Sequence, residues 1–552
     1  MPLLYSGRFR AIPTILCLLC LYVFPSAGRT APPTDGSEIQ KLTDLTILDA
    51  VRTALAQQPD VFIAREAATF QKGVYTEAGG EFDLTGEASL SLNRDRASIG
   101  ARSAAGFTAV PSEQDTAAAG LGLHKKLRTG QTLSLEVAES RTDATMAGIQ
   151  QTGPDNVGQV FFTVIQPLGK GRGREGADAG EETARRQAEA ALQEMLHVLS
   201  RKAAEAAQAY WNHLSAIRQV KILEEAEERS RVLTEQISTL IAKEELPAVE
   251  ITQAQANLAD ARRVRLNGDQ ALFDSRQQLL LAMGIEGRQL AASVACRDDF
   301  PAIPDEKAMR SFDPQALAPI ALKLRSDYRA REWAESAREV FLSGVERNMA
   351  PQVDLKLKAG YVGYEPGSGL DALSRSFEEN VPGASVSMQI VASWPFSNSA
   401  MKGRMVQARS QLEQVRWEKE KLDRQIRSDL MSAWSQLKSR IAVLEEAAVA
   451  RDKYEASLAS EKKKYLLGMS TLINVLTVEN QVTQARLNGV LAQTEVAASI
   501  VKLRFESGTL LSEDGEWITV RAEDLIRLPP TEMLPQNPPR ERIPPGKGGQ
   551  AW

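Results

Sequence analysis

The chain has 552 residues, enough for three or four ordinary domains, so it needs neither disulfides nor a metal to build a core. It carries 66 basic and 71 acidic residues, a net charge of −5, which argues against a nucleic-acid-binding protein because neutralising phosphates requires a basic excess. With 3 His and 3 Cys a Cys/His metal framework is excluded, and 43% hydrophobic with 25% charged residues excludes wholesale disorder.

Residues 1–28 have the three parts of a secretory signal peptide. Arg8 and Arg10 precede an apolar run from Ala11 to Phe24, and small residues follow up to Gly28. The run of about 14 residues is shorter than the ~20 that a transmembrane helix needs. We therefore expect an exported protein that begins with a linker over 29–42. Cys17 and Cys20 would leave with the signal, and Cys296 would remain as a thiol without a disulfide partner.

The rest of the sequence reads as two copies of one unit, a first repeat over 43–290 and a second over 311–506, joined by a linker over 291–310. Each copy opens with a helical pattern and continues into segments where apolar and polar residues alternate, which is typical of strands. The strands are expected at about 82–166 in the first copy and about 352–394 in the second.

The first copy contains more strands than the second. Alternating segments at Ala117–Lys125 and Gln131–Ser140 predict a surplus hairpin around Gly130, which gives four strands in the first copy and two in the second. No later stretch of apolar residues approaches ~18, so a mature chain that crosses a membrane would have to do so as a closed β-barrel.

Each copy then predicts a very long helix, from about Ala177 to Ala242 and from about Ala400 to Tyr465, each roughly 100 Å long at ~1.5 Å per residue. Apolar residues recur every seven positions, which is typical of coiled coils. A second helix returns after a short break, so the sequence predicts two antiparallel helical hairpins, over about 177–284 and 400–506. Residues 507–528 form a short mixed segment, and the Pro-rich residues 529–552 are expected to be a disordered tail.

No set of residues points to catalysis or to a cofactor. Gly171, Gly173 and Gly176 form a G-x-G-x-x-G sequence between a strand and a helix, but no second strand with an acidic end follows, so we interpret it as a turn rather than a dinucleotide site. The three His are too scattered for a metal site. We therefore expect neither an enzyme nor a bound cofactor.

In the order of its motifs the chain resembles the TolC-like outer-membrane efflux protein family, over about residues 43–506. The motifs are Ala54 to Asp60, Gln166-Pro167-Leu168, Trp394-Pro395-Phe396, Ala209-Tyr210-Trp211 and the two hairpin tips. The resemblance implies a mainly α fold with a membrane β-barrel: a homotrimer with a 12-stranded barrel, four strands from each chain, and a periplasmic coiled-coil tunnel. With this strand count, the surplus hairpin is expected to be an extension of that barrel.

The resemblance also implies a function and partners. The trimer would lie in the outer membrane of a Gram-negative bacterium, extend into the periplasm and act as a passive conduit for efflux or secretion. It would contact outer-membrane lipid and work with a periplasmic adaptor protein and an inner-membrane pump. The adaptor would meet the hairpin tips: Glu244, Glu245, Leu246 and Pro247 of the first, and Leu467, Gly468, Met469, Ser470 and Thr471 of the second.

A gate at these tips is a further implication of the resemblance. Tyr465 and Glu250 match a tyrosine and an acid that hold the tip closed in well-known members, while Ser470 stands where those members have an arginine. A ring of pore-facing aspartates maps onto Asn474 and Thr477, so an acidic cation trap is not expected.

Two other classes remain open. A periplasmic adaptor also has a coiled-coil hairpin, but normally one, and the two repeats argue against it. A structural coiled-coil protein without a pore would lack the alternating strand segments before each long helix.

Overall fold

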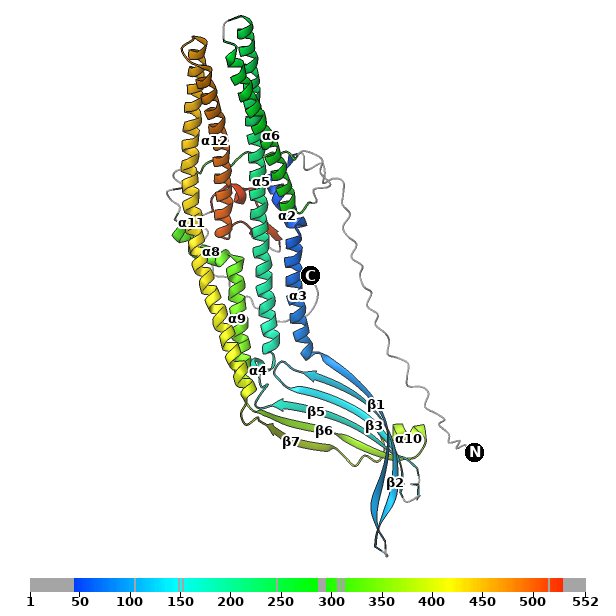
Figure 1. Ribbon diagram of the computed structural model, residues 1–552. Coiled ribbons are helices and arrows are strands. Elements are labelled where there is room, and N and C mark those ends of the chain that lie inside the picture. Colours follow the sequence, from blue (N-terminus) through cyan, green and yellow to red (C-terminus); the bar gives the residue numbers. More distant parts are fainter. Residues whose placement is uncertain are drawn as a thin grey trace, which may run out of the picture.

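A computed structural model describes residues 44–529, except for 104–105, 147–148, 151–152, 245–246, 286–293, 305–308, 310–312 and 515–516. The predicted signal peptide over 1–28, the linker over 29–42 and all but the first residue of the tail over 529–552 lie outside the described residues. The molecule is elongated: a curved β-sheet forms one end, and two helical hairpins reach to the opposite end (Figure 1).

Two very long helices organise the helical part. The first hairpin consists of α5 (Ala179–Ala242) and α6 (Val249–Met283), and the second of α11 (Ser399–Leu466) and α12 (Leu472–Glu506). With 64 and 68 residues, α5 and α11 are each about 100 Å long. The heptad spacing thus located both helices to within two residues.

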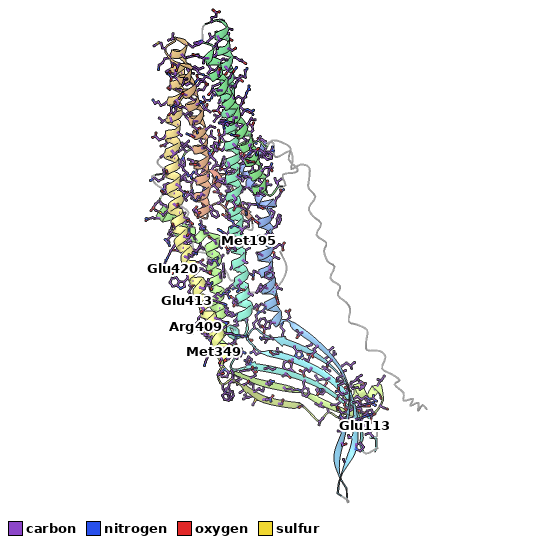
Figure 2. All side chains as sticks on the ribbon, viewed as in Figure 1. Glu113, Met195, Met349, Arg409, Glu413 and Glu420 are labelled. Atoms are coloured by element: carbon purple, nitrogen blue, oxygen red, sulfur yellow. The ribbon has the colours of Figure 1, made fainter. Side chains whose placement is uncertain are left out.

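Shorter helices accompany the long ones on the side of the sheet. The segment α3 (Pro59–Gly79) lies beside α5, and α9 (Ser326–Arg347) packs against both α5 and α11 (Figure 1). Each long helix therefore has a returning helix along one half and a shorter helix along the other. Charged side chains such as Arg409, Glu413 and Glu420 cover the exposed surface of α11 near the sheet (Figure 2).

The main core lies midway along the helices, where small elements gather around them. These are α2 (Ile47–Gln57), α8 (Pro314–Leu324), α13 (Ala522–Ile526) and the two-stranded sheet of β8 (Ser512–Asp514) and β9 (Trp517–Thr519). Tyr210 and Trp211 of α5 are fully buried here. In α11 the heptad residues Leu430, Leu437 and Leu444 pack against α8 and α12. Within the described residues, no helix combines the length and the apolar character required to cross a membrane.

The sheet is antiparallel, and its strands come from both repeats. The six long strands pair in the order β1 (Leu84–Ser103), β2 (Gly106–Lys126), β3 (Thr132–Met146), β5 (Asp155–Pro167), β6 (Gln352–Pro366) and β7 (Ser385–Ser393). The short β4 (Ile149–Gln150) pairs only with β3, and α10 (Leu370–Arg375) lies in the connection between β6 and β7. The pairing of β5 with β6 joins the two repeats.

The surplus hairpin lies within the sheet of the single chain. Its two predicted segments are parts of β2 and β3: β2 pairs with β1 and β3, and β3 also pairs with β5. The 12-stranded barrel takes four strands from each chain, whereas the single chain pairs six long strands in one sheet; the barrel and its strand count stay predictions.

Four helix–strand junctions connect the two parts of the molecule. The turn η2 (Gly80–Phe82) leads from α3 into β1, and α4 (Arg174–Ala177) separates β5 from α5. The G-x-G-x-x-G sequence lies in the second junction, where Gly171 and Gly173 have φ of +80° and +73°. Glycine adopts these angles at no steric cost, so this sequence works as a turn between strand and helix.

Candidate functional site

The tips of the two hairpins lie at the end of the molecule farthest from the sheet (Figure 1). In the first tip Glu244 has a φ of +63° and is exposed, as is Pro247, while Glu245 and Leu246 lie outside the described residues. In the second tip Gly468 supplies the left-handed conformation that ends α11, with a φ of +68°. Thr471 caps α12 by accepting a hydrogen bond from the amide of Asn474.

Both tips expose large apolar side chains. Val249, Leu466, Leu467 and Met469 are each more than 70% exposed. Exposed apolar groups that cluster at the end of a molecule mark a surface that contacts a partner. In the single chain these side chains are open to solvent.

A hydrogen bond joins the two hairpins near their tips. The hydroxyl of Tyr465, in the last turn of α11, donates to Oε2 of Glu250, in the first turn of α6, at 3.0 Å. The bond lies beside a small apolar cluster in which Ile237 and Leu472 are buried. The structure therefore brings together the two residues that the family resemblance paired.

The other three candidate gate residues do not reach across. The hydroxyl of Ser470 bonds Glu461 of its own hairpin, and Asn474 donates to that hydroxyl at 3.3 Å. Thr477 donates to the carbonyl of Ile473, one turn earlier in α12, at 2.8 Å. Since a serine side chain is much shorter than an arginine, Ser470 forms no second link to Glu250.

We expect the tips to loosen at high pH. Burial and the hydrogen bond to Glu250 raise the pKa of Tyr465 to about 12, above the ordinary value of 10.0. A raised pKa means that the protonated tyrosine stabilises the closed pair: this contribution is complete below pH 10 and is lost as the pH rises through 12. The distance between spin labels at Lys243→Cys and Leu467→Cys should lengthen over this range.

The matched control for this measurement is Tyr465→Phe. It removes the titrating hydroxyl and keeps the ring, so the distance between the labels should no longer change between pH 10 and pH 12. A change of the same size in Tyr465→Phe would assign the pH effect to another group.

Two clusters of charges that the sequence analysis did not identify also join the hairpins. Glu479 of α12 is 4% exposed and lies between Arg229 of α5, at 3.3 Å, and Lys462 of α11, at 3.5 Å. Among the described residues, neither carboxylate oxygen of Glu479 has a hydrogen-bond partner, and the two cations lie close enough to balance its charge. The first cluster thus has a buried negative centre between two positive side chains.

The second cluster has the opposite charges. Arg486, seven residues along the same face of α12, pairs with Glu455 of α11 at 2.7 Å and with Glu225 of α5 at 3.1 Å. The face of α12 that packs between α5 and α11 therefore has a negative residue followed by a positive one. Each of the two pairs with residues of opposite charge on both α5 and α11. The spacing of Glu479 and Arg486 was visible in the sequence, but their partners depend on how the two hairpins align, which no local pattern encodes.

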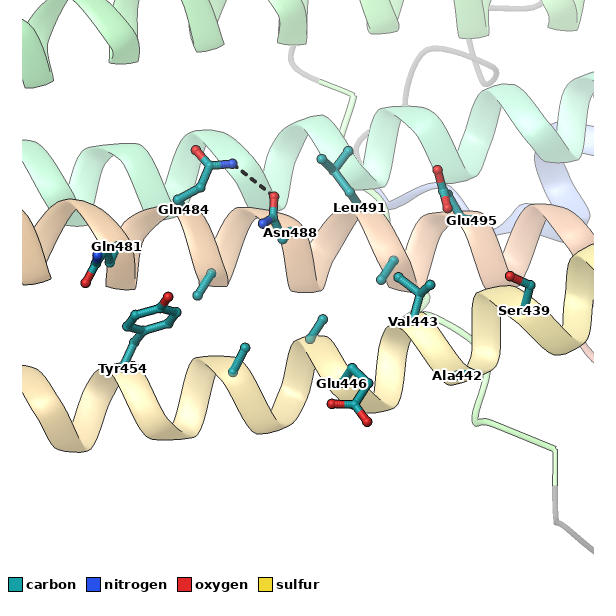
Figure 3. Close-up of a pocket in the computed structure, with 14 residues that line it drawn as sticks. Ser439, Ala442, Val443, Glu446, Tyr454, Gln481, Gln484, Asn488, Leu491 and Glu495 are labelled. Carbon is teal, nitrogen blue, oxygen red and sulfur yellow. Dashed lines mark hydrogen bonds between the residues drawn. The ribbon is translucent and has the colours of Figure 1, made fainter.

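A groove lies between α11 and α12 of the second hairpin. Its volume is about 790 Å³, and alanines such as Ala442 and Ala485 line much of it (Figure 3). Gln484 donates a hydrogen bond to Asn488 along the wall of the groove, at 2.9 Å (Figure 3). These residues include no pair of nucleophile and base. In the part of the chain that the structure describes, no group of three or more His, Cys, Asp or Glu could hold a metal ion.

Solved structures share this architecture, although no protein-family model and no curated protein sequence matches the chain. The outer-membrane channel OprN aligns with a TM-score of 0.60 at 16% identity, over 85% of this chain and 91% of OprN. The outer membrane protein VceC of Vibrio cholerae aligns with a TM-score of 0.59 at 15% identity, over 84% of this chain and 96% of VceC. The open state of the MtrE outer membrane channel of Neisseria gonorrhoeae aligns with a TM-score of 0.57 at 12% identity, over 84% of this chain and 88% of MtrE. At these identities the likeness is one of fold, and the chain has the TolC-like fold of these outer-membrane channels.

Proposed function

We propose that this chain is the subunit of a homotrimeric outer-membrane channel, a passive conduit from the periplasm to the exterior and not an enzyme. The observation that carries the proposal is the continuity of the fold: amphipathic strands at one end run directly into helices about 100 Å long that end in exposed tips. The fold shared with OprN, VceC and MtrE supports it.

The helices would form the periplasmic part of the channel. Three copies of the two hairpins would enclose a coiled-coil tunnel, while the sheets of the three copies close into a barrel that leaves no open edge in the lipid. The signal peptide expected at 1–28 supports export, and residues 507–528 would lie in the periplasm beside the middle of the tunnel.

The tips would form the gate and the docking surface. Tyr465, Glu250 and the charge clusters centred on Glu479 and Arg486 hold the two hairpins of one chain together, as a closed mouth requires. Ser470, Asn474 and Thr477 contribute no contact across the hairpins, so we assign them no role in the latch. The exposed apolar residues of the tips would meet a periplasmic adaptor, which in turn joins an inner-membrane pump.

Imaging and conductance together test this proposal. Negative-stain images of the detergent-solubilised mature protein should show trimeric cylinders about 130–140 Å long, the length of the helices plus a membrane core of ~30 Å. The same particles in a planar bilayer should conduct ions. Thin single-chain rods without conductance would exclude a channel and favour a structural coiled-coil protein.

A further inference from the structure

The six long strands share one apolar row. Residues directly opposite each other in neighbouring antiparallel strands point to the same face of a sheet. One such row crosses the whole sheet and is formed by Gly86, Leu123, Leu135, Phe162, Ala359 and Val386. Its four large residues are between 40% and 75% exposed in the single chain. In this row every side chain larger than alanine is therefore apolar, and all of these side chains lie on the same face of the sheet.

The adjacent row lies on the opposite face and is polar throughout. Consecutive residues of a strand point to opposite faces. The row one residue away consists of Thr85, His124, Ser134, Thr163, Lys358 and Ser387. The strands β2 and β3 thus obey the same division into an apolar and a polar face as the four other strands. A hairpin that lay outside the lipid would not require one apolar and one polar face.

The turn between β2 and β3 is attached to the helix–strand junctions. Thr129 accepts a hydrogen bond from the amide of Gly173 at 3.1 Å, and Arg128 binds both carboxylate oxygens of Glu181, in the first turn of α5, at 2.6 and 2.7 Å. A Cβ atom on Gly130 would lie 2.2 Å from the carbonyl oxygen of Gly171, so the two turns are in close contact. This end of the inserted hairpin therefore lies level with the ends of β1 and β5.

At the other end, β2 pairs with β3 as far as Ser112, and beyond that point only β1 and β2 continue to pair with each other. Just before that point, Arg94 and Arg96 of β1 pair with Asp115 and Glu113 of β2 (Figure 2 labels Glu113). The apolar band of both strands ends before these charges. The pattern of a membrane-spanning segment is therefore limited to the end of these strands that lies near the turn at Gly130, and in β1 it reaches as far as Asn93.

Each of the two edge strands of the sheet has one side without a partner strand. Within the described chain, β1 pairs only with β2, and β7 pairs only with β6. Each unpaired backbone group in lipid costs several kcal/mol, so both edges require a partner strand. Because the sheet has six antiparallel strands, β1 and β7 run in opposite directions. A second copy of the chain can therefore place its β7 beside β1 with the same antiparallel pairing as every other pair in the sheet.

From these observations, and on the basis of the trimeric channel proposed above, we infer that all six long strands of each chain form the barrel wall, so that three copies close an 18-stranded barrel. Closing it with four strands from each chain would require β2 and β3 to leave the sheet and break their ladders with β1 and β5. Barrel diameter grows roughly in proportion to strand number, so the membrane pore would be about one and a half times as wide as a 12-stranded one.

Electron cryomicroscopy of the full mature chain in lipid nanodiscs tests this inference. The expected map shows three copies and 18 strands in the wall, with β7 of one copy next to β1 of the next. Twelve strands in the wall, with β2 and β3 outside it, would overturn the inference and leave the channel intact. Particles without a barrel would overturn the proposed function and the inference together.

Spin labels give a second, independent test in liposomes. On a Cys296→Ser background, a label at Leu121→Cys of β2 should be reached by oxygen dissolved in the lipid, and one at Ala138→Cys of β3 by a water-soluble nickel complex. Met388→Cys and Ser387→Cys of β7 are the matched pair in a strand that lies in the wall under either strand count. Equal access of the nickel complex to Leu121→Cys and Ala138→Cys would place β2 and β3 outside the wall.

Discussion

Replacing Arg325 by methionine should destabilise the helical part of the molecule by about 3–5 kcal/mol, the cost of removing one member of a buried ionic cluster. Arg325 is 8% exposed and precedes α9. Its guanidinium binds both oxygens of Asp327, at 3.0 and 2.7 Å, and Oε2 of Glu506, the last residue of α12, at 2.6 Å. The methionine variant would leave the buried carboxylate of Glu506 and the partly buried carboxylate of Asp327 without this partner. Urea unfolding followed by circular dichroism measures the loss.

The pH dependence of this loss separates charge from packing. Burial raises the pKa of Glu506 even beside Arg325, whereas the hydrogen bonds and charge of Arg325 outweigh burial at Asp327 and lower its pKa. Without Arg325 the pKa of Glu506 should rise further. A raised pKa favours the folded state at low pH, so the variant should lose most stability near neutral pH and less near pH 4.

Arg331→Met is the control for Arg325→Met. Arg331 lies in α9 itself, but its pair with Glu418, at 3.4 Å, is about half exposed, so its loss should change stability by about 0.5 kcal/mol or less. If Arg325→Met and Arg331→Met were equally stable, the buried cluster would not hold α9 to α12.

Replacing Arg229 by methionine should open the mouth that we propose the hairpin tips to close. Glu479 would keep a single cation, Lys462, and its buried carboxylate would cost about 1–3 kcal/mol in the closed form. A difference of this size changes the ratio of open to closed tips by about 5–150-fold. We expect a higher single-channel conductance in a planar bilayer.

The double variant Arg229→Met, Glu479→Leu should largely restore the closed state, because replacing a buried ion pair by apolar side chains is often neutral. Arg231→Met is the control: Arg231 lies on the same helix, but its ion pairs within the described residues are with Glu228 and Glu235 of that helix. Conductance that stays at the level of the unmodified channel in Arg229→Met would remove the Glu479 cluster from the gate.

Local patterns were enough to predict most of the helical part. Heptads located α5 and α11, because this repeat connects residues close in sequence. For the strands, the alternation of apolar and polar residues from Leu84 predicts a strand only as far as Leu92, whereas β1 runs to Ser103. Beyond Leu92 apolar alternation stops, and β2 stabilises the extension through backbone pairing, which side-chain patterns do not record.

The candidate gate residues show a second limit of the sequence. The pairing of Tyr465 with Glu250 came from the family resemblance, whereas the contacts of Glu479 with Arg229 and Lys462 were missed. Arg229 and Glu479 are 250 positions apart in a chain where charged residues cover every helix. Only the alignment of the hairpins selects these pairs.

The turn at Gly130 joins two strands where the other strands of the sheet continue into helices or connect at the far end. In the barrel proposed above, β2 and β3 would therefore add membrane wall without adding periplasmic helices, since they enter and leave on the same side through β1 and β5. In such an architecture the width of the membrane part can change while the width of the periplasmic part stays the same. Insertion or loss of one hairpin could adapt the outer opening to larger cargo while the docking end stays unchanged for its existing partners.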